Sequence, residues 1–365
     1  MELSLVFGIV AATAVAIHAD RAPLLAKAAN STTLTYKILQ VPDLHYTGDP
    51  TYKCSDPPTD VQKCTEAYIV LTDMLSKMLD DVQPDFVVFT WDQIESLIYI
   101  QNNAKANHAI DAYSAPVIAR KLPWAMVFGN HDESYIPAIS SEKKVMIKHI
   151  EELPFSYSSY VMIKHIEELP FSYSSYGPQD IGGVGNYELA LQAPSDGSWG
   201  AAGTDVLRMY FLDTFKDGKV KDTQLSYFKS LAAAHKTKAP ALMFFHIPLA
   251  EYNEFTGQGQ GQKNEKVSAT KSNGLFQAMV DMGDVKAAFV GHDHKNNFCF
   301  LKTPIHLCYG GGVGYGAYGD KTIPRMARVI EWSKSPDVES IVTWQYKQNT
   351  ANTYDKYTIY NQVRS

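Results

Sequence analysis

The sequence is poor in cysteine and has no excess of positive charge. Its four cysteines in 365 residues are too few for a disulfide-dense small domain. No Cys-x-x-Cys pair occurs, so a thiolate zinc site has no support. Lys and Arg number 33 against 39 Asp and Glu, a formal net charge of −6, whereas phosphate-backbone binding needs a basic surface. This balance argues against a general nucleic-acid binder, and the 45% hydrophobic content indicates a large folded core.

Long apolar runs are also scarce. The run at the amino end, Leu3–Ile17, is shorter than the roughly 20 residues of a membrane-spanning helix. Small residues suited to cleavage, Ala16 or Ala19, lie at the end of this run. We therefore predict a signal peptide over residues 1–19 and a secreted, extracellular protein without a membrane span after cleavage. Because Glu2 replaces the positive charge usual at the start of a signal peptide, an uncleaved anchor is the alternative.

The prediction of secretion bears on the cysteines and on one glycosylation sequence. Four cysteines allow three pairings, and closeness in the sequence favours Cys54 with Cys64 and Cys299 with Cys308. Four free thiols are the alternative. Asn30 begins an Asn-Ser-Thr sequence and is a candidate glycosylation site.

A segment of 16 residues occurs twice in tandem. Residues 145–160 read VMIKHIEELPFSYSSY, and residues 161–176 repeat them letter for letter. Solenoid repeats are longer, recur at least three times and diverge, so this is a recent duplication or an error in the gene model. Apolar residues spaced at i, i+4 and i+7 predict a short amphipathic helix that a proline ends. One copy suffices for a fold, so we expect the second copy to be a surface insertion without chemistry.

Five short apolar runs each stop at polar residues that can bind metal. Runs of about five β-branched and aromatic residues predict buried strands, with helices between them, such as 66–78 and 223–235. The runs are 35–41, 86–90, 125–128, 241–245 and 287–290. In open α/β sheets, binding sites form at the carboxyl ends of strands. The five strand ends are therefore expected to converge on one cleft.

The polar residues after these runs share one coordination chemistry. They are Asp43, His45, Asp92, Asn130, His131, Asp132, His246, His292 and His294. Asp, His and Asn without Cys suit borderline to hard divalent ions such as zinc, manganese or iron. One ion cannot use so many ligands, whereas two ions about 3.5–4 Å apart, bridged by a carboxylate, would use them all. Such a pair suits phosphate-ester hydrolysis, in which a metal-activated hydroxide attacks phosphorus and a histidine protonates the leaving group.

The order of these motifs resembles the calcineurin-like metallophosphoesterase superfamily, and within it the single-domain branch similar to purple acid phosphatases. The motifs are Asp-x-His at 43–45, a strand-terminal Asp at 92, Gly-Asn-His-Asp at 129–132, a lone His at 246 and Gly-His-x-His at 291–294. The likeness runs from about residue 34 to residue 332. It implies an α/β fold of four layers, α/β/β/α, with two mixed sheets flanked by helices. It also implies a metal-dependent phosphoric ester hydrolase that acts on a small phosphorylated substrate, a phosphate monoester.

The resemblance further implies a role for each motif residue. The ligands of one ion would be Asp43, His45, Asp92 and His294. The ligands of the second would be Asp92 as the bridge, Asn130, His246 and His292. His131 is implied as the general acid, with Asp132 holding its ring. The other histidines, His18, His108, His235 and His306, fit no position in this scheme.

Two positions depart from the family pattern. Trp91 precedes Asp92 where the family has glycine, and a Cβ there strains a backbone that needs a positive φ. This motivates an alternative function, a catalytically impaired secreted binding protein on the same fold. Glu95 stands where tyrosine-ligated purple phosphatases carry their tyrosine, so a ferric charge-transfer colour is not expected.

We divide the chain according to these signals. Residues 1–19 are the signal peptide, 20–33 a leader, 34–335 the phosphoesterase domain with its duplicated insert at 161–176, and 336–365 a C-terminal extension. Two features keep two interpretations each. Asp213, after an apolar run, either joins the site or caps a turn. The glycine-rich segment 310–319 either lines the cleft or forms a tight hairpin.

Overall fold

The fold is taken from a computed structural model. It describes residues 21–46, 51–61, 67–90, 92–95, 103–132, 157–236, 238–269, 271, 273–350 and 355–363. The predicted signal peptide, Cys64, Trp91 and the first copy of the repeat up to residue 156 lie outside these ranges.

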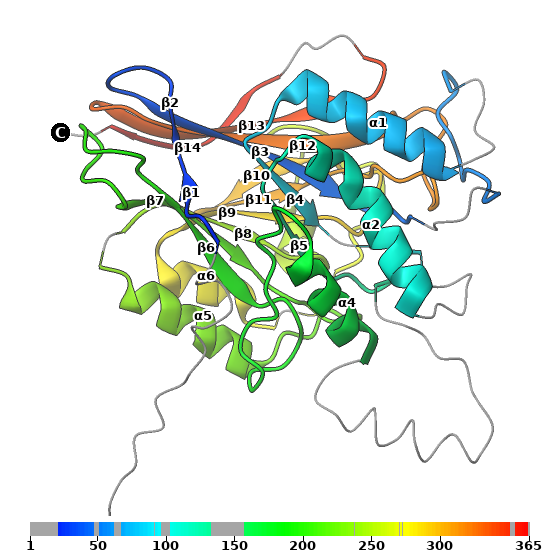
Figure 1. The fold of residues 1–365 in the computed structure, drawn as a ribbon, viewed down its shortest axis with the longest axis horizontal. Helices are drawn as coiled ribbons and strands as arrows, with labels where there is room; N and C mark the ends of the chain where they lie inside the picture. The colour runs from blue at the N-terminus through cyan, green and yellow to red at the C-terminus, as the bar shows by residue number, and fades with distance from the viewer. Residues whose placement is uncertain are drawn as a thin grey trace, which may run out of the picture.

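Two mixed β-sheets form the centre of the molecule (Figure 1). The first has the order β1-β6-β7-β8-β9-β11-β10. Its strands are β1 (Leu24–Leu25), β6 (Tyr187–Gln192), β7 (Asp205–Phe211), β8 (Ala241–Phe244), β9 (Val285–Val290), β10 (Cys299–Lys302) and β11 (Ile305–Tyr309). The second has the order β14-β13-β12-β3-β4-β5, and β2 pairs with β3. Its strands are β2 (Lys27–Ala28), β3 (Leu34–Pro42), β4 (Phe86–Thr90), β5 (Trp124–Val127), β12 (Met326–Lys334), β13 (Val338–Lys347) and β14 (Tyr357–Val363).

The strands that precede the candidate ligands run parallel within each sheet. β3, β4 and β5 are parallel neighbours in the second sheet, and β7, β8 and β9 in the first. Strands covered on both faces are apolar along their whole length, which is why β4 and β8 are buried at every residue. The five predicted strands correspond to β3, β4, β5, β8 and β9, so these predictions are confirmed.

Helices cover the outer face of each sheet (Figure 1). α1 (Ala67–Val82), α2 (Asn103–Ala119) and α4 (Tyr157–Glu168) pack side by side next to the second sheet, and α5 (Asp222–Ala234) and α6 (Leu275–Met282) lie against the first. A short 3-10 helix, η1 (Ala250–Glu254), follows β8. The arrangement confirms the predicted four-layer α/β/β/α fold. No helix among the described residues is both long and apolar enough to cross a membrane.

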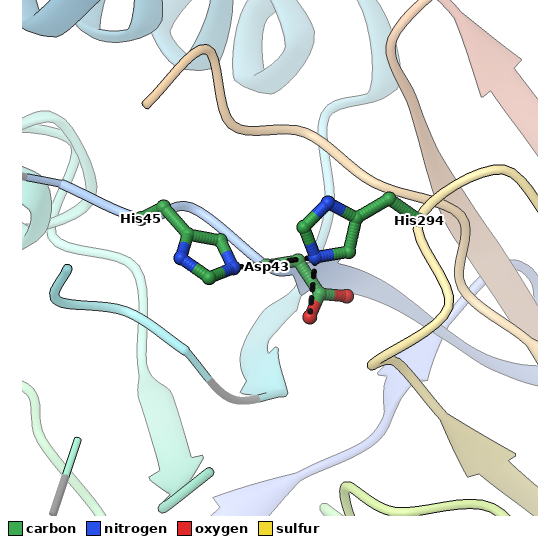
Figure 2. A group of neighbouring side chains, drawn as sticks. All are labelled: Asp43, His45 and His294. Carbon is green, nitrogen blue, oxygen red and sulfur yellow. Dashed lines mark hydrogen bonds and ion pairs between the residues drawn. The ribbon is translucent and has the colours of Figure 1, made fainter. Parts of the chain in front are cut away.

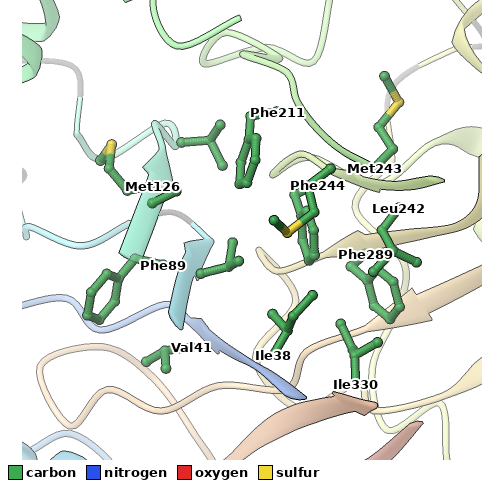
Figure 3. Close-up of a cluster of buried hydrophobic side chains, with 14 of the residues drawn as sticks. Ile38, Val41, Phe89, Met126, Phe211, Leu242, Met243, Phe244, Phe289 and Ile330 are labelled. Atoms are coloured by element: carbon green, nitrogen blue, oxygen red, sulfur yellow. The ribbon is translucent and has the colours of Figure 1, made fainter. Parts of the chain in front are cut away.

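The core lies between the two sheets. Phe211, Phe244 and Phe289 come from three adjacent strands of the first sheet and stack with ring centroids 5.5 and 5.4 Å apart. Ile38 and Ile330 of the second sheet complete this layer, and all five side chains are fully buried (Figure 3). Burying each such side chain stabilises the fold by about 1.5–3 kcal/mol. This packing fixes how the two sets of strand ends face each other.

The second copy of the repeat belongs to the core and is not the surface insertion that we predicted. It supplies most of α4, whose Ile163 and Ile166 are fully buried. Its later residues follow the edge of β5, where the Trp124 N–H donates to the Phe171 carbonyl at 3.0 Å and the Tyr173 N–H donates to the Trp124 carbonyl at 2.7 Å. The two copies are identical, so side-chain chemistry cannot select between them. The copy next to β6 in the chain is the one that supplies these contacts.

The predicted boundaries at both ends of the domain also differ from the structure. The boundary at residue 335 falls within the β12–β13 hairpin, in which Trp332 pairs with Ile341. The predicted extension therefore contributes β13 and β14 to the second sheet. In the predicted leader, β1 pairs with β6 and β2 with β3. Strand pairing therefore holds both the predicted leader and the predicted extension in the sheets.

The cysteine prediction is confirmed where the structure describes it. Cys299 and Cys308 lie opposite each other on β10 and β11 and form a disulfide. Cys54 is also disulfide-bonded, and its predicted partner lies outside the described residues. Asn30 is exposed in the turn before β3, and its glycosylation stays a prediction.

Ile163→Ala tests the role of the second copy. Because the side chain is fully buried, we expect the free energy of unfolding to fall by about 2–5 kcal/mol, measured by urea denaturation. The matched substitution in the first copy, Ile147→Ala, tests whether one copy alone supplies this core contact. An unchanged stability in Ile163→Ala would contradict the packing described here.

Candidate metal centre

The carboxyl ends of five strands, β3, β4, β5, β8 and β9, meet at one edge of the two sheets. They bring together every predicted ligand: Asp43, His45, Asp92, Asn130, His246, His292 and His294. Three groups of carboxylates and imidazoles there have ligand atoms within 4.8 Å of one another. Residues separated by up to about 250 positions therefore share one cluster.

The first group consists of Asp43, His45 and His294 (Figure 2). The His294 Nε2 atom lies 3.2 Å from the His45 Nε2 atom and 3.5 Å from Asp43 Oδ1. All three side chains are buried. Two ring nitrogens and one carboxylate thus point at a common position.

The second group consists of Asp92, His246 and His292. His246 Nε2 lies 3.1 Å from His292 Nδ1 and 3.3 Å from Asp92 Oδ2. The Asn130 side-chain oxygen is 2.8 Å from the same His246 nitrogen. Asp92 Oδ2 also lies 3.6 Å from His45 Nε2 of the first group. Asp92 therefore stands between the two groups, where the bridging ligand was predicted.

Four of the predicted ligands have a left-handed backbone, which residues other than glycine rarely adopt. They are Asp43 (φ 51°), His45 (φ 45°), Asp92 (φ 47°) and His292 (φ 75°). Hydrogen bonds hold this geometry: the His292 N–H donates to Asp43 Oδ1 at 3.0 Å, and the His131 N–H donates to Asp92 Oδ1 at 2.8 Å. Such strain gathers at functional sites. The sequence predicted backbone strain at Trp91, which lies outside the described residues. It did not predict the left-handed backbone of the ligands themselves.

The carboxylates of the cluster have imidazoles, and not Lys or Arg, as their neighbours in the described part of the chain. Among the described residues, no Lys or Arg forms an ion pair with Asp43 or Asp92. Burial and the charge of Asp92 hold the pKa of the Asp43 carboxyl well above its usual range. Burial also acts to raise the pKa of Asp92, but His246 and its neighbouring imidazoles outweigh it and hold that pKa well below the usual range. Burial lowers the pKa of His292 to about 4, so this ring is neutral at pH 7.

The donor set fits a cation between His45 and His294. The Tyr318 carbonyl lies 2.9 Å from Nδ1 of His294, and the Glu95 carboxylate lies 2.8 Å from Nδ1 of His45. Both oxygens accept hydrogen bonds, so either ring, in its neutral form, carries its hydrogen on Nδ1. The two Nε2 lone pairs then face each other at 3.2 Å. Opposed lone pairs beside a buried carboxylate are suited to a shared positive ion.

His131 lies at the opening of the cluster with Glu95 behind it. Glu95 is buried, and its Oε1 lies 3.1 Å from Nδ1 of His131. Burial acts to lower the pKa of the His131 ring, but the Glu95 hydrogen bond and the nearby carboxylates raise it to about 9. Burial acts to raise the pKa of Glu95, but the bonds to His131 and His45 hold it well below its usual range.

The prediction that Asp132 holds the ring of His131 is corrected by these contacts. The Asp132 oxygens accept the backbone N–H groups of Ile94 and Gly129, each at 3.0 Å. Glu95 contacts the ring instead. From the sequence, Glu95 was interpreted only as the residue that replaces the tyrosine of the tyrosine-ligated phosphatases. Its position three residues after the bridging Asp92 was the available signal.

The glycine-rich segment packs against the loop that carries the first ligands. The Gly314 N–H donates to the Asp43 carbonyl at 2.8 Å. A Cβ added at Gly314 or at Gly316 would lie 2.1 Å from the carbonyl oxygen of Leu44 or of His45, respectively. Close backbone contact thus explains the run of glycines. Tyr318 from the same segment stacks on the ring of His294, with centroids 4.1 Å apart.

Asp213 caps a turn and does not join the metal cluster, which is the second of the two interpretations given above. One of its oxygens accepts the Phe215 N–H at 2.7 Å, and the other accepts the Val184 N–H at 2.8 Å. These bonds form a turn after β7 and tie it to a neighbouring loop. Asp213 is not among the groups of potential metal ligands in the described part of the chain.

Comparison with known proteins agrees with this geometry. The sequence model of the calcineurin-like phosphoesterase family matches residues 36–296. The chain therefore belongs to the calcineurin-like phosphoesterases, as the motifs predicted. Within that class its curated relatives include proteins of the purple acid phosphatase type.

Two relatives and one solved structure illustrate the range. Probable inactive purple acid phosphatase 29 of Arabidopsis thaliana is 33% identical over 341 residues, which cover 85% of this chain and 82% of that protein. Phosphatase DCR2 of Saccharomyces cerevisiae is 32% identical over 307 residues, covering 76% of this chain and 48% of that protein. A dimetal phosphatase from Danio rerio superposes with a TM-score of 0.48 at 10% identity, covering 90% of this chain and 98% of the other.

Gly314→Ala tests the contact between the glycine-rich segment and the first ligand loop. The added methyl group would displace the backbone of Asp43 and Leu44. We expect a loss of about 1–3 kcal/mol in the free energy of unfolding, together with weaker zinc binding by titration calorimetry. In the control Gly203→Ala, the methyl group meets nothing within 4 Å, although the φ of +76° strains it. Equal zinc affinity in both variants would refute the coupling.

Proposed function

We propose that the chain is a secreted dimetal phosphoesterase that hydrolyses phosphate monoesters. The observation that carries this proposal is the pair of ligand groups with Asp92 between them. One ion would be held by Asp43, His45, Asp92 and His294. The second would be held by Asp92, Asn130, His246 and His292. When bound, such a pair of ions neutralises phosphate oxygens and lowers the pKa of the attacking water.

His131 is suited to act as the general acid. Its side chain is 18% exposed, whereas those of His45 and His246 are 2% and 0% exposed. Its Nδ1 faces Glu95, so its other ring nitrogen remains for the leaving oxygen of a substrate. Protonation of that oxygen avoids the release of an alkoxide and contributes roughly 10²–10⁴-fold in rate. A small substrate fits this proposal because His45, His246 and His294 are buried, whereas His131 and His292 are partly exposed.

Metal analysis and two substitutions test the proposal. We expect the purified chain to bind two ions, to hydrolyse an aryl phosphate and to lose that activity on chelation. Asp92→Ala removes the shared ligand and is expected to reduce both metal content and activity. His131→Ala is expected to retain the metal and lose about 10²–10⁴-fold in kcat.

Asp337→Ala, an exposed carboxylate in the β12–β13 turn, serves as the control for both variants. Full activity in Asp92→Ala would refute the proposal. Activity that survives complete metal removal would refute it as well.

A second candidate function is a binding protein that keeps the fold and has lost catalysis. Three curated plant relatives, 30–33% identical to this chain, carry the words "probable inactive" in their names. In this chain the departure that favours such a role is Trp91, in place of the family's glycine. The ligand set itself is complete, which favours the enzyme.

Trp91→Gly separates the two candidates. Asp92 already has its imidazole and backbone contacts in the native chain, so we expect turnover of an aryl phosphate to change little. Turnover that rises from undetectable to measurable would instead identify the native chain as an inactive binding protein. Metal content should be measured in both proteins, because a difference there would separate lost binding from lost chemistry.

A further inference from the structure

We infer that Glu95 is a positioning residue that orients a metal ligand, His45, and the acid, His131, at the same time. This inference rests on the proposed function. It assigns a task to the residue that stands where tyrosine-ligated relatives carry a metal-binding phenol. Glu95 acts by accepting hydrogen bonds from the two imidazole rings, at the nitrogens that face away from the candidate metal positions.

The geometry is that of one carboxylate shared by two rings. Glu95 Oε2 lies 2.8 Å from Nδ1 of His45, and Oε1 lies 3.1 Å from Nδ1 of His131. The carboxylate is 4% exposed, so water competes little for either oxygen. The two rings meet edge to face, with centroids 4.7 Å apart and planes at 79°. Each oxygen therefore serves a different ring, and the rings are fixed relative to each other.

An ionised carboxylate accepts hydrogen bonds and donates none, so it selects the tautomer of His45. The ring must carry a hydrogen on Nδ1, which leaves the Nε2 lone pair facing Asp92 and His294. A carboxylate behind a ligating histidine fixes its tautomer and ring orientation and increases its basicity.

The same contact directs His131. With Nδ1 turned to Glu95, the opposite nitrogen of the ring is the one available to a substrate. Because both rings depend on one side chain, displacing Glu95 would disturb metal binding and proton donation together. Asp132 is held in another direction, because its two oxygens accept the backbone N–H groups of Ile94 and Gly129.

The backbone around Glu95 is held as firmly as its side chain. The Glu95 N–H donates to the Tyr46 carbonyl at 3.1 Å, and the Tyr46 N–H donates to the Gln93 carbonyl at 2.8 Å. The loop after β4 is thus paired with the loop after β3 that carries His45. The Asp132 bond to the Ile94 N–H fixes the residue before Glu95. The carboxylate has little freedom to leave its position.

Substitution of Glu95 by Gln and by Ala distinguishes positioning from mere filling of space. Gln has the same size but only one oxygen, so it can accept from one ring and must present its NH₂ group to the other. Ala removes both acceptors. We expect Glu95→Gln to lie between the native chain and Glu95→Ala in every measurement. The matched control is Glu339→Gln, another buried glutamate, which accepts the Trp332 indole N–H at the opposite end of β12 from the site.

The first measurement is independent of activity. Long-range proton–nitrogen NMR of the metal-free, histidine-labelled full chain reports which nitrogen of His45 carries the hydrogen. We expect the Nδ1–H form in the native chain and in Glu339→Gln, and a shift toward the Nε2–H form in Glu95→Ala. Zinc affinity should fall about 10–100-fold in Glu95→Ala. An unchanged tautomer and an unchanged zinc affinity in Glu95→Ala would overturn the inference.

The second measurement is kinetic, at saturating metal. We expect kcat to fall about 10–100-fold in Glu95→Ala while KM changes little, because Glu95 lies behind the rings. A change in KM alone would overturn the assignment. The proposed function fails separately, if the native chain neither binds two ions nor hydrolyses phosphate esters. In that case the tautomer of His45 still decides whether Glu95 orients the ring.

Discussion

The rest of the site depends on the burial of two carboxylates, Asp43 and Asp92, within one cluster of imidazoles. Burying an unpaired charge is costly, and two like charges in one cluster repel each other. The fold supports them with backbone N–H groups from His292 and His131 and with rings from the ends of β3, β8 and β9. That support requires the carboxyl ends of β3, β4, β5, β8 and β9 to face each other, which in turn requires the packing of Phe244 and its neighbours between the sheets.

Local sequence patterns were sufficient to locate the strands that precede the candidate ligands. They did not show how all the strands pair in the two sheets. Apolar runs located β3, β4, β5, β8 and β9. Of these, β4, β5 and β8 are buried at every residue, so no polar alternation obscures them. The short strands β1 and β2 and the C-terminal pair β13 and β14 were missed. Only β1 has a distant partner, β6, whereas β2, β13 and β14 pair with the strands next to them in the chain. The repeat shows the limit most clearly. Two identical sequences have identical propensities, so local patterns could not show that the copy next to β6 packs in the core.

The ligands were predictable because each one follows a strand within a short motif. The residues that support them were not. Glu95 and Tyr318 act on ring nitrogens that belong to residues far away in sequence, so nothing local distinguishes them from other glutamates and tyrosines. The family resemblance implied that Asp132 holds the ring of His131, whereas its oxygens accept the backbone N–H groups of Ile94 and Gly129.

The contact between the glycine-rich segment and the first ligand loop has a consequence for biosynthesis. Asp43 leaves the ribosome early, yet its carbonyl bonds to Gly314 and its carboxylate to the N–H of His292, 249 positions later. At roughly 5–20 residues per second, the growing chain must wait many seconds before these partners emerge. Contacts of such long range also form slowly. The cluster can therefore be completed only after the segment from His292 to Tyr318 has been synthesised, so the full set of candidate ligands is not assembled before then.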